Sequence, residues 1–564
     1  MTTAHVKSTA YHRFMAQNDI LLNDMRRIYV IAGFVLALIL LICGRLFLLV
    51  QTDQGSKYAA VRDAETVSSR RNIVDRNGSI LATNLMTGSL YANPKEVTSP
   101  VDAARKIKTV FPDLDKKKII EKLKSNKSFV WIKRNITPAQ QQKFLQLGIV
   151  GVYIEKSEKR AYIHGNTTSH LLGFTSIDMQ GRSGVERFFD EQLVGSGDPL
   201  RLSVDIRVQN IVHHALKEAI DKFSAQGGTA VMVDVETGEV IAMVSLPDFD
   251  PHRVTKESQK LMFNMATQGI YELGSIFKVF TAVAAFESGA VKLSDHFDAT
   301  KAIKIGKFRV GDYRGKNRWL SVPEIFIYSS NIGAMKILLE MGKEKLSEAY
   351  HKLGLFEPLV GFEYGEVAMP VLTGQWSESR ALTASYGYGV ATTPLHFLRA
   401  LAAVVNGGRL INLSLIKGNP NRIEQNVLSE KTSKTIRKLM YKAALQGTSR
   451  RSRVNGYMVG GKTGSANKII NGAYDKKKHL ASVTSIFPMN KPKYAMLITL
   501  DAPQGTKETH GFSTGGWTAA PVAAQIIERA GPILGVLPVD EEDEVIQKAM
   551  YVKVEYDQQN RALG

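Results

Sequence analysis

The strongest apolar signal in the chain is a run near its N-terminus. Residues 28–50 carry a single charged group, Arg45, and a helix of this length can span a bilayer. The preceding tail ends in Arg26 and Arg27 and has more basic than acidic groups, which is typical of the cytoplasmic side. The pattern predicts a cytoplasmic tail at 1–27, a transmembrane helix at 28–50 and the remaining residues across the membrane. A cleavable signal peptide or a buried core helix fits less well, because the run is long and no Ala-x-Ala site follows it closely.

Residues 51–204 show short strand, turn and helix signals, which predict a separate mixed module. Residues 73–80 read as a strand, an Asn-Gly turn and a second strand. The lysine-rich segment 115–127 predicts a helix with a solvated face, and residues 181–189 predict a short helix after a glycine-rich turn. Because this module shows no evident catalytic chemistry, its simplest interpretation is a pedestal that spaces the following domain from the membrane.

From Asp205 onward the pattern predicts an α+β domain that ends near residue 535. Asp205 is a helix N-cap before an amphipathic stretch, the middle of the domain (255–450) is mostly helical, and a last helix is expected at 518–530. Strands are expected in two groups, at 229–235, 239–246, 456–461, 480–488 and 494–502. Strands from both ends of the domain predict one antiparallel sheet flanked by helices. Residues 536–564 are acidic and polar, and a loosely ordered tail is expected there.

Composition narrows the function classes. The chain has 564 residues and a formal net charge of +20, with its lysines and arginines spread along the whole length. No nucleic-acid-binding motif accompanies this charge, and attraction to a membrane or an acidic polymer fits it equally well. Cys43, the only cysteine, lies in the apolar run, so cysteine catalysis and thiolate metal sites are excluded elsewhere. We predict no metal, no cofactor and no nucleic-acid partner.

A candidate nucleophile opens an apolar helix predicted from residue 275 to residue 288. Ser275 and Lys278 are three residues apart, so they share one helix face. A serine hydroxyl becomes a good nucleophile when a base takes its proton, and a lysine with a lowered pKa is such a base. The spacing alone is a weak signal, because Ser-x-x-Lys also occurs at residues 414–417 and 465–468.

Two later motifs single out Ser275. Residues 329–331 read Ser-Ser-Asn before a helical run, and residues 461–465 read Gly-Lys-Thr-Gly-Ser beside a strand. Each is weak alone, as an N-cap or as a turn, but their order after a Ser-x-x-Lys helix is hard to obtain by chance. The same order occurs in penicillin-binding proteins and serine β-lactamases.

Each motif residue has a chemical task in this reading. Ser329 relays a proton to a leaving amine, while the amide of Asn331 holds Lys278 and a substrate carbonyl. Lys462 supplies positive charge, Thr463 donates to a substrate carboxylate, and Gly464 lets a substrate backbone pair along the strand. The N–H groups of Ser275 and Ser465 form the expected oxyanion hole.

The chain resembles a class B penicillin-binding protein from the apolar run to about residue 535. The resemblance includes Arg70, Asp75, Arg76 and Gly78, then His170–Phe174, Gly184–Glu186, the hairpin at 234–239 and the segment 386–394. More narrowly, it is similar to the division-specific (septal) peptidoglycan D,D-transpeptidase of Gram-negative bacteria. That similarity lies in residues 91–97 (Tyr-Ala-Asn-Pro-Lys-Glu-Val), 173–181 and 501–505.

The resemblance implies a bacterial inner-membrane protein with a membrane-proximal pedestal and a periplasmic, penicillin-binding catalytic domain. It implies peptidoglycan stem peptides on a lipid-linked nascent glycan as substrate, and β-lactams as inhibitors that acylate the serine. The implied partners are a polytopic division glycosyltransferase and other divisome proteins.

Five positions depart from the family pattern. Leu273 stands in place of a usual proline, Ile276 and Ser465 in place of common threonines, Met265 in place of an arginine and Ile163 in place of a proline. None removes a group that the chemistry needs. Those at 265 and 273 flank the nucleophile, so they bear on turnover and β-lactam affinity.

Other functions stay open at this point. The elongation-specific class B transpeptidase is the closest competitor. A β-lactamase needs a device that activates water, and no Glu-x-x-Leu-Asn segment lies between Asn331 and Lys462. A β-lactam sensor or a divisome scaffold without turnover is the non-enzymatic alternative, and a sensor coupled to a metalloprotease would show His-Glu-x-x-His, which is absent.

Overall fold

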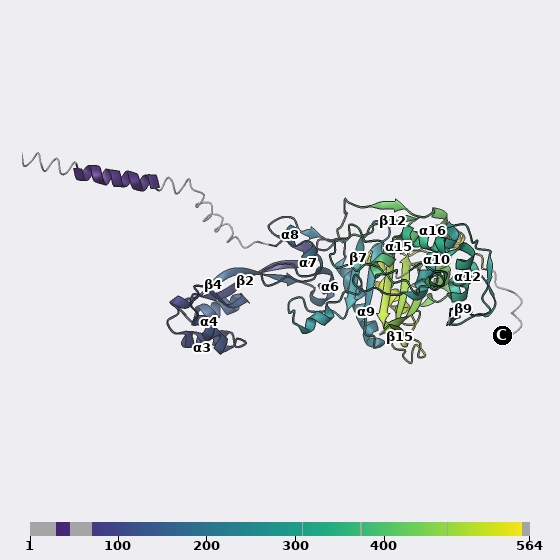
Figure 1. Ribbon diagram of the computed structural model, residues 1–564, viewed down its shortest axis with the longest axis horizontal. Helices are drawn as coiled ribbons and strands as arrows, with labels where there is room; N and C mark the ends of the chain where they lie inside the picture. Colours follow the sequence, from purple (N-terminus) through teal and green to yellow (C-terminus); the bar gives the residue numbers. More distant parts are fainter. Residues whose placement is uncertain (1–29, 46–69, 307, 373–374, 471, 555–564) are drawn as a thin grey trace, which may run out of the picture. The chain divides into compact units, whose positions relative to one another are not determined.

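The computed structural model describes residues 30–45, 70–306, 308–372, 375–470 and 472–554. The chain divides into two units, residues 1–69 and 70–564. In the first unit, residues 30–45 form a helix (Figure 1). Its side chains are exposed. Within the described ranges, no helix reaches the length and apolar character that crossing a membrane requires. The predicted 28–50 span extends beyond the described residues at both ends, and the predicted 1–27 tail lies wholly outside them.

The second unit begins with a sheet of five strands, here called the N-terminal sheet. Its strands are β1 (Ile73–Val74), β2 (Ile80–Ala92), β3 (Val130–Ile136), β4 (Val152–Tyr162) and β5 (Leu200–Arg201). The long strand β2 pairs with β1, β3 and β4, so it organises the sheet. The strand–turn–strand prediction at 73–80 is confirmed, since β1 and the start of β2 flank the Asn-Gly turn.

Three helices cover one face of the N-terminal sheet: α3 (Pro100–Val110), α4 (Lys116–Leu123) and α5 (Pro138–Leu145). They bury a small core with Leu90 and Ile132, and Phe111 is fully enclosed in it. The short helices α6 (Ser169–Leu172), α7 (Gly184–Phe188) and α8 (Asp190–Leu193) follow β4. The lysine-rich segment therefore forms a helix, as predicted, with Ile119 and Leu123 turned inward.

The second sheet, here the C-terminal sheet, has the strand order β14-β15-β16-β6-β7 and is antiparallel throughout. Its strands come from both ends of the domain, as predicted: β6 (Gly227–Asp234), β7 (Val240–Leu246), β14 (Gly460–Ile470), β15 (Ala473–Phe487) and β16 (Tyr494–Asp501). The prediction of a strand at 456–461 was wrong in its limits. The strand begins only at Gly460 and carries Lys462 within it, because the lysine and glycine residues of the motif pair with β15 rather than forming a turn.

Helices cover both faces of the C-terminal sheet. On one face, α9 (Ile206–Lys222) and α17 (Ala519–Ile533) pack on Ala230, Met232 and Ile498. On the other face the helices form a larger core with Val231 and Leu497. They are α10 (Lys278–Glu287), α11 (Val322–Tyr328), α12 (Asn331–Met341), α13 (Lys343–Lys352), α14 (Glu378–Ala384), α15 (Pro394–Val405) and α16 (Glu430–Gln446). Successive side chains of β6 point to opposite faces of the sheet, so they enter the two cores in turn.

The remaining strands are short. They are β8 (His296–Asp298), β9 (Ile303–Ile305), β10 (Phe308–Val310), β11 (Trp319–Ser321), β12 (Arg409–Ile411) and β13 (Glu424–Asn426). A last helix, α18 (Glu544–Met550), lies in the segment expected to be a loose tail. That expectation was wrong for residues up to 554, since Met550 and Val552 are buried and Tyr441 donates to Glu541 at 3.1 Å. The sequence did not indicate this packing, because the apolar residues of this acidic segment are few and far apart.

A buried charge network ties the start of the second unit to α7. Glu186 is fully buried and receives hydrogen bonds from Arg70 Nε at 2.6 Å and Arg160 Nε at 2.7 Å. Arg70 also pairs with Asp190, and Arg160 donates to Asn84. Glu186, with Asp190 as a second partner of Arg70, thus compensates two guanidinium groups that are almost completely withdrawn from water.

We expect Glu186→Gln to lower the free energy of unfolding by about 3–5 kcal/mol, because it leaves two buried cations short of a counter-charge. Urea unfolding of the full chain measures this, with the exposed Glu191→Gln on the neighbouring helix as the matched control. Equal stability of the two variants would contradict a supporting role for the network.

Candidate active site

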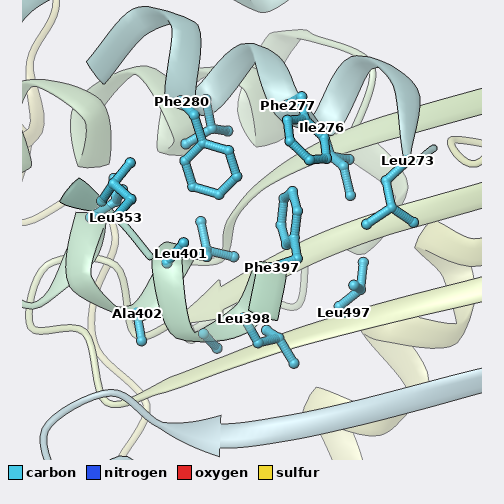
Figure 2. Packing of buried hydrophobic residues seen from close by; sticks show 14 of the residues in the cluster. Leu273, Ile276, Phe277, Phe280, Leu353, Phe397, Leu398, Leu401, Ala402 and Leu497 are labelled. Carbon is cyan, nitrogen blue, oxygen red and sulfur yellow. The ribbon is translucent and has the colours of Figure 1, made fainter. Parts of the chain in front are cut away.

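Ser275 lies in a tight turn at the start of the predicted helix. Residues Gly274–Phe277 form a 3-10 turn, and the α-helix α10 begins at Lys278. Ile276 and Phe277 are fully buried beside Phe397 of α15, so the apolar face of the turn is fixed in the core while Ser275 is only half-buried (Figure 2). The predicted helix is therefore in place, although its first turn is tighter than expected.

Glycines bring this turn close to its neighbours. Gly274 has φ +59°, and a Cβ on it would lie 2.8 Å from the carbonyl oxygen of Ser465. A Cβ on Gly464 would lie 2.4 Å from the carbonyl oxygen of Leu273. The predicted role of Gly464 toward substrate is thus joined by a steric one: its missing side chain lets β14 approach the nucleophile turn.

Lys278 is buried beside Ser275. Its Nζ lies 3.1 Å from Ser275 Oγ, and it donates to the Ser329 carbonyl oxygen and to Asn331 Oδ1, each at 2.6 Å. Both of these oxygens are acceptors only. A neutral amine that donates its two hydrogens to these two oxygens keeps its lone pair free to accept the proton of the Ser275 hydroxyl. This geometry suits a base better than an ammonium ion.

Burial also favours the neutral form. Removal from water lowers the pKa of Lys278 to about 7, while the negative charge of Asp312 acts in the opposite direction. The pKa of Lys462 is also lowered, first by burial and then by the nearby Lys278. Two ammonium groups in this enclosed space would repel each other, so the site favours having one of them neutral.

Ser329 lies between the two lysines. Lys462 Nζ donates to Ser329 Oγ at 2.7 Å, and Lys278 Nζ lies 3.3 Å from the same oxygen. Ser329 ends α11 in the left-handed region, with φ +61°, a conformation that few side chains other than Gly, Asn and Asp adopt readily. A strained residue that places a hydroxyl between two amines is typical of a functional site.

Asp312 positions the second motif, and sequence reasoning missed it. It accepts hydrogen bonds from Asn331 N at 2.5 Å, Ile332 N at 3.0 Å and Ser330 Oγ at 2.6 Å. The carboxylate thus caps the N-terminus of α12, where the first N–H groups lack partners. Gly311 also accepts from the Asn331 amide at 3.1 Å. The only signal in the sequence is a Gly-Asp pair between short strands, which is too common to identify such a residue.

The third motif lies on an edge strand. β14 pairs with β15 alone, so its other edge is open for an added strand next to Ser275. Thr463 donates to Thr448 Oγ1 at 2.7 Å, and Ser465 Oγ accepts from Gly515 N at 3.1 Å. Thr448 and Gly515 are further neighbours of the site that carry no recognisable motif in the sequence.

The five departures from the family pattern leave the reacting side chains in place. Leu273, Ile276 and Met265 are buried, and the first two pack in the core shown in Figure 2. Ile163 is exposed, and Ser465 contributes a hydroxyl to the edge of the site. At positions 265, 273 and 276 an apolar side chain stands where the family usually has a polar or rigid residue. These departures therefore alter the packing around the nucleophile turn.

The structure brings together all five predicted catalytic residues: Ser275, Lys278, Ser329, Asn331 and Lys462 are joined by hydrogen bonds. Thr463, Gly464 and Ser465 lie beside them on β14. Within the part of the chain that the structure describes, no group of histidine, cysteine or carboxylate side chains has the arrangement of a metal site. A serine paired with a buried amine, a second hydroxyl between two amines and an open strand edge define an active-site serine enzyme that transfers acyl groups.

Comparison with known proteins gives the family. Residues 228–528 match the penicillin binding protein transpeptidase domain, and residues 65–218 match the penicillin-binding protein dimerisation domain. The chain belongs to the penicillin-binding protein transpeptidase family.

Individual relatives agree with this assignment. The chain is 33% identical to the probable peptidoglycan D,D-transpeptidase FtsI of Caulobacter vibrioides over 86% of this chain and 84% of that protein. It is 30% identical to the probable peptidoglycan D,D-transpeptidase PenA of Neisseria gonorrhoeae over 85% and 87% of the two chains. The fold is similar to the crystal structure of a peptidoglycan synthetase from Bifidobacterium adolescentis, with a TM-score of 0.67, 21% identity and coverage of 85% and 98%.

The lowered pKa of Lys278 predicts the pH dependence of acylation. The amine accepts the serine proton only when it is neutral, so the rate of acylation by a fluorescent penicillin should rise with pH, with a midpoint near its pKa of about 7, and level off above it. A rate constant that keeps rising beyond pH 9 would indicate an ordinary lysine pKa and contradict this assignment.

We expect Asp312→Asn to lower the acylation rate about tenfold, because an amide is a weaker partner for the two N–H groups at the start of α12. Stopped-flow measurement with the same penicillin tests this, and Asp298→Asn, at a half-buried carboxylate that accepts from Thr300, serves as the matched control. A rate equal to that of the control would show that Asp312 does not position Asn331.

Proposed function

We propose that this protein is a septal peptidoglycan D,D-transpeptidase that cross-links stem peptides through an acyl-enzyme at Ser275. The observation that carries the proposal is the hydrogen-bonded set of Ser275, Lys278, Ser329 and Lys462 beside an open strand edge. Similarity to the probable transpeptidases FtsI and PenA supports the same activity.

In the first half-reaction, Ser275 Oγ attacks the carbonyl carbon of the terminal D-Ala–D-Ala bond while Lys278 Nζ takes the hydroxyl proton. The oxyanion of the tetrahedral intermediate accepts hydrogen bonds from the backbone N–H groups of Ser275 and Ser465. Lys278 gives this proton to Ser329, which passes its own proton to the departing amine as the C–N bond breaks, and D-alanine leaves. Ser275 is then held as an ester of the stem peptide.

In the second half-reaction, an amine of a neighbouring stem peptide attacks the ester carbonyl. Lys278, now neutral again, takes the proton of that amine and returns it to Ser275 Oγ as the C–O bond breaks, which restores the Ser275 hydroxyl. Lys462 and Thr463 hold the substrate carboxylate, and Asn331 holds a substrate carbonyl while it orients Lys278. A β-lactam follows the first half-reaction and stops there, which makes the protein a target of these antibiotics.

The proposed organisation follows from the sequence. A cytoplasmic tail at 1–27, an inner-membrane anchor at 28–50, a periplasmic pedestal at 51–204, a transpeptidase domain at 205–535 and a C-terminal segment at 536–564 account for the whole chain. The apolar run and its basic flank support the anchor. A polytopic division glycosyltransferase and other divisome proteins are the proposed partners.

We expect Ser275→Ala to abolish covalent labelling by fluorescent penicillin and release of D-alanine from a stem-peptide substrate, because Ser275 Oγ lies 3.1 Å from the Lys278 amine that would take its proton. Ser288→Ala, at the other end of the same helix, is the matched control and should label normally. Labelling that survives in the Ser275 variant would disprove the nucleophile assignment.

Depletion of the protein from its native cell separates the septal role from elongation. Filamentation is the expected outcome, since cells that cannot build a septum keep elongating. Rounded cells would instead assign the enzyme to elongation, and rescue of division by Ser275→Ala would assign it to a scaffold without turnover.

A further inference from the structure

The outer face of the N-terminal sheet carries an exposed group of aromatic side chains. Leu90, Ala92 and Ile132 turn toward the core under α3 to α5, so the alternate residues emerge on the opposite face. Tyr91 on the central strand is directly paired with Trp131 of β3 and Tyr153 of β4. Phe129 completes the group at the start of β3. We call Tyr91, Phe129, Trp131 and Tyr153 the aromatic platform.

The rings of the platform are packed against one another but not covered. Tyr91 stacks on Phe129 with 4.8 Å between ring centroids, and it lies 6.2 Å from Trp131 and 5.5 Å from Tyr153. Phe129 and Tyr153 nevertheless expose 44% and 43% of their surface. Tyr153 donates its hydroxyl to Glu96, which fixes the ring. A contiguous exposed aromatic surface of this kind marks a binding site more often than chance.

Cations border the platform. The Arg134 guanidinium lies over the Trp131 ring at 4.9 Å, and Lys122 of the lysine-rich helix α4 donates to the Trp131 carbonyl oxygen at 2.7 Å. This part of the surface therefore combines flat apolar faces with positive charge.

A pocket of about 480 Å³ adjoins the platform at Asn135, the neighbour of Arg134. Arg134 also pairs with Asp178, whose neighbours Ile177 and Met179 line this pocket. None of the lining residues is acidic. They are Asn135, Lys159, Arg160, Tyr162, Phe174, Thr175, Ser176, Ile177, Met179, Pro251, His252 and Val254.

Two features of the pocket suit an anion. Lys159 forms no ion pair with any residue that the structure describes, so its charge is available. The Arg160 side chain is only 1% exposed, and its Nη2 has no hydrogen-bond partner among the described residues, although Nε and Nη1 are bound to Glu186 and Asn84. A buried guanidinium N–H without a partner is costly, and a ligand oxygen would satisfy it.

We propose that this face binds the peptidoglycan strand itself, away from Ser275, with sugar rings on the aromatic platform and a stem-peptide carboxylate in the pocket. The proposal rests on the proposed function, which makes peptidoglycan the polymer the enzyme meets. A glycan strand offers flat C–H faces for the exposed rings and pendant carboxylates for Lys159 and Arg160. The face thus holds one strand near the active site while Ser275 is acylated by successive stem peptides and transfers them.

Binding of soluble, uncross-linked glycan strands to the full-length protein tests this. The protein is first acylated with penicillin, so that Ser275 cannot contribute, and strands with intact stem peptides are compared with strands stripped of peptide by an amidase and then amidated at the lactyl carboxylates that the amidase frees. We expect Phe129→Ala with Trp131→Ala to weaken binding of both strands about tenfold. Lys159→Glu should weaken only the peptide-bearing strand, about tenfold, because it acts on the carboxylate.

The controls are Tyr551→Ala, an equally large exposed ring near the C-terminus, and Lys156→Glu, a charge reversal on the same strand outside the pocket. Both should bind like the unaltered protein. Penicillin labelling of every variant separates this proposal from the proposed function, since labelling reports Ser275 alone. Unchanged binding of both strands in the platform variant overturns the proposal, and so does loss of a divisome protein with unchanged glycan binding, which would assign the face to a protein.

Discussion

The active site depends on keeping two lysines in one buried space on either side of the Ser329 hydroxyl. Burial penalises a charged amine at both positions, and the nearby Lys278 raises that cost further for Lys462. The site resolves this by holding Lys278 as a neutral amine, whose two hydrogens meet the Ser329 carbonyl oxygen and Asn331 Oδ1 while its lone pair faces the Ser275 hydroxyl. The resulting neutral amine is the base that the serine needs. The surrounding fold can therefore be understood as the means of bringing three distant segments around these two amines.

Close backbone packing meets that requirement. Gly274 and Gly464 let the nucleophile turn lie against β14, and a Cβ on Gly387 would lie 2.0 Å from the Gly274 carbonyl oxygen on the other side. Ser329 holds a left-handed backbone and Asp312 caps the helix that follows it. The strain at Ser329 is therefore offset locally by hydrogen bonds to a carboxylate, while the buried side chains of α10 and α15 keep the turn from shifting.

Much of this arrangement could be predicted from the sequence, because it rests on patterns of neighbouring residues. Periodicity placed α9 and its Asp205 cap, and the order of three short motifs was enough to select Ser275 from three Ser-x-x-Lys matches. Asp312, Thr448 and Gly515 could not be found in this way, since their role comes from tertiary contacts and none stands in a distinctive pattern. The same holds for the start of β14 and for α18, where pairing and docking with distant segments overrode local turn and polarity signals.

The contacts of the N-terminal sheet show that the module preceding Asp205 is more than a spacer. Tyr162 N donates to His252 Nε2 at 2.9 Å, and the two ring nitrogens of His170 meet the carbonyl oxygens of Ser245 and Leu261. These partners lie in β7 and in the segment between β7 and the nucleophile turn, which Asn264 also ties to the His170 carbonyl oxygen at 3.3 Å. The backbone leading to Ser275 is therefore held from the N-terminal side as well as by the core. These hydrogen bonds reach the segment that leads to Ser275 and Lys278, whereas Ser329 and Lys462 lie on separate elements. A shift transmitted through them would therefore move Ser275 and Lys278 together relative to Ser329 and Lys462.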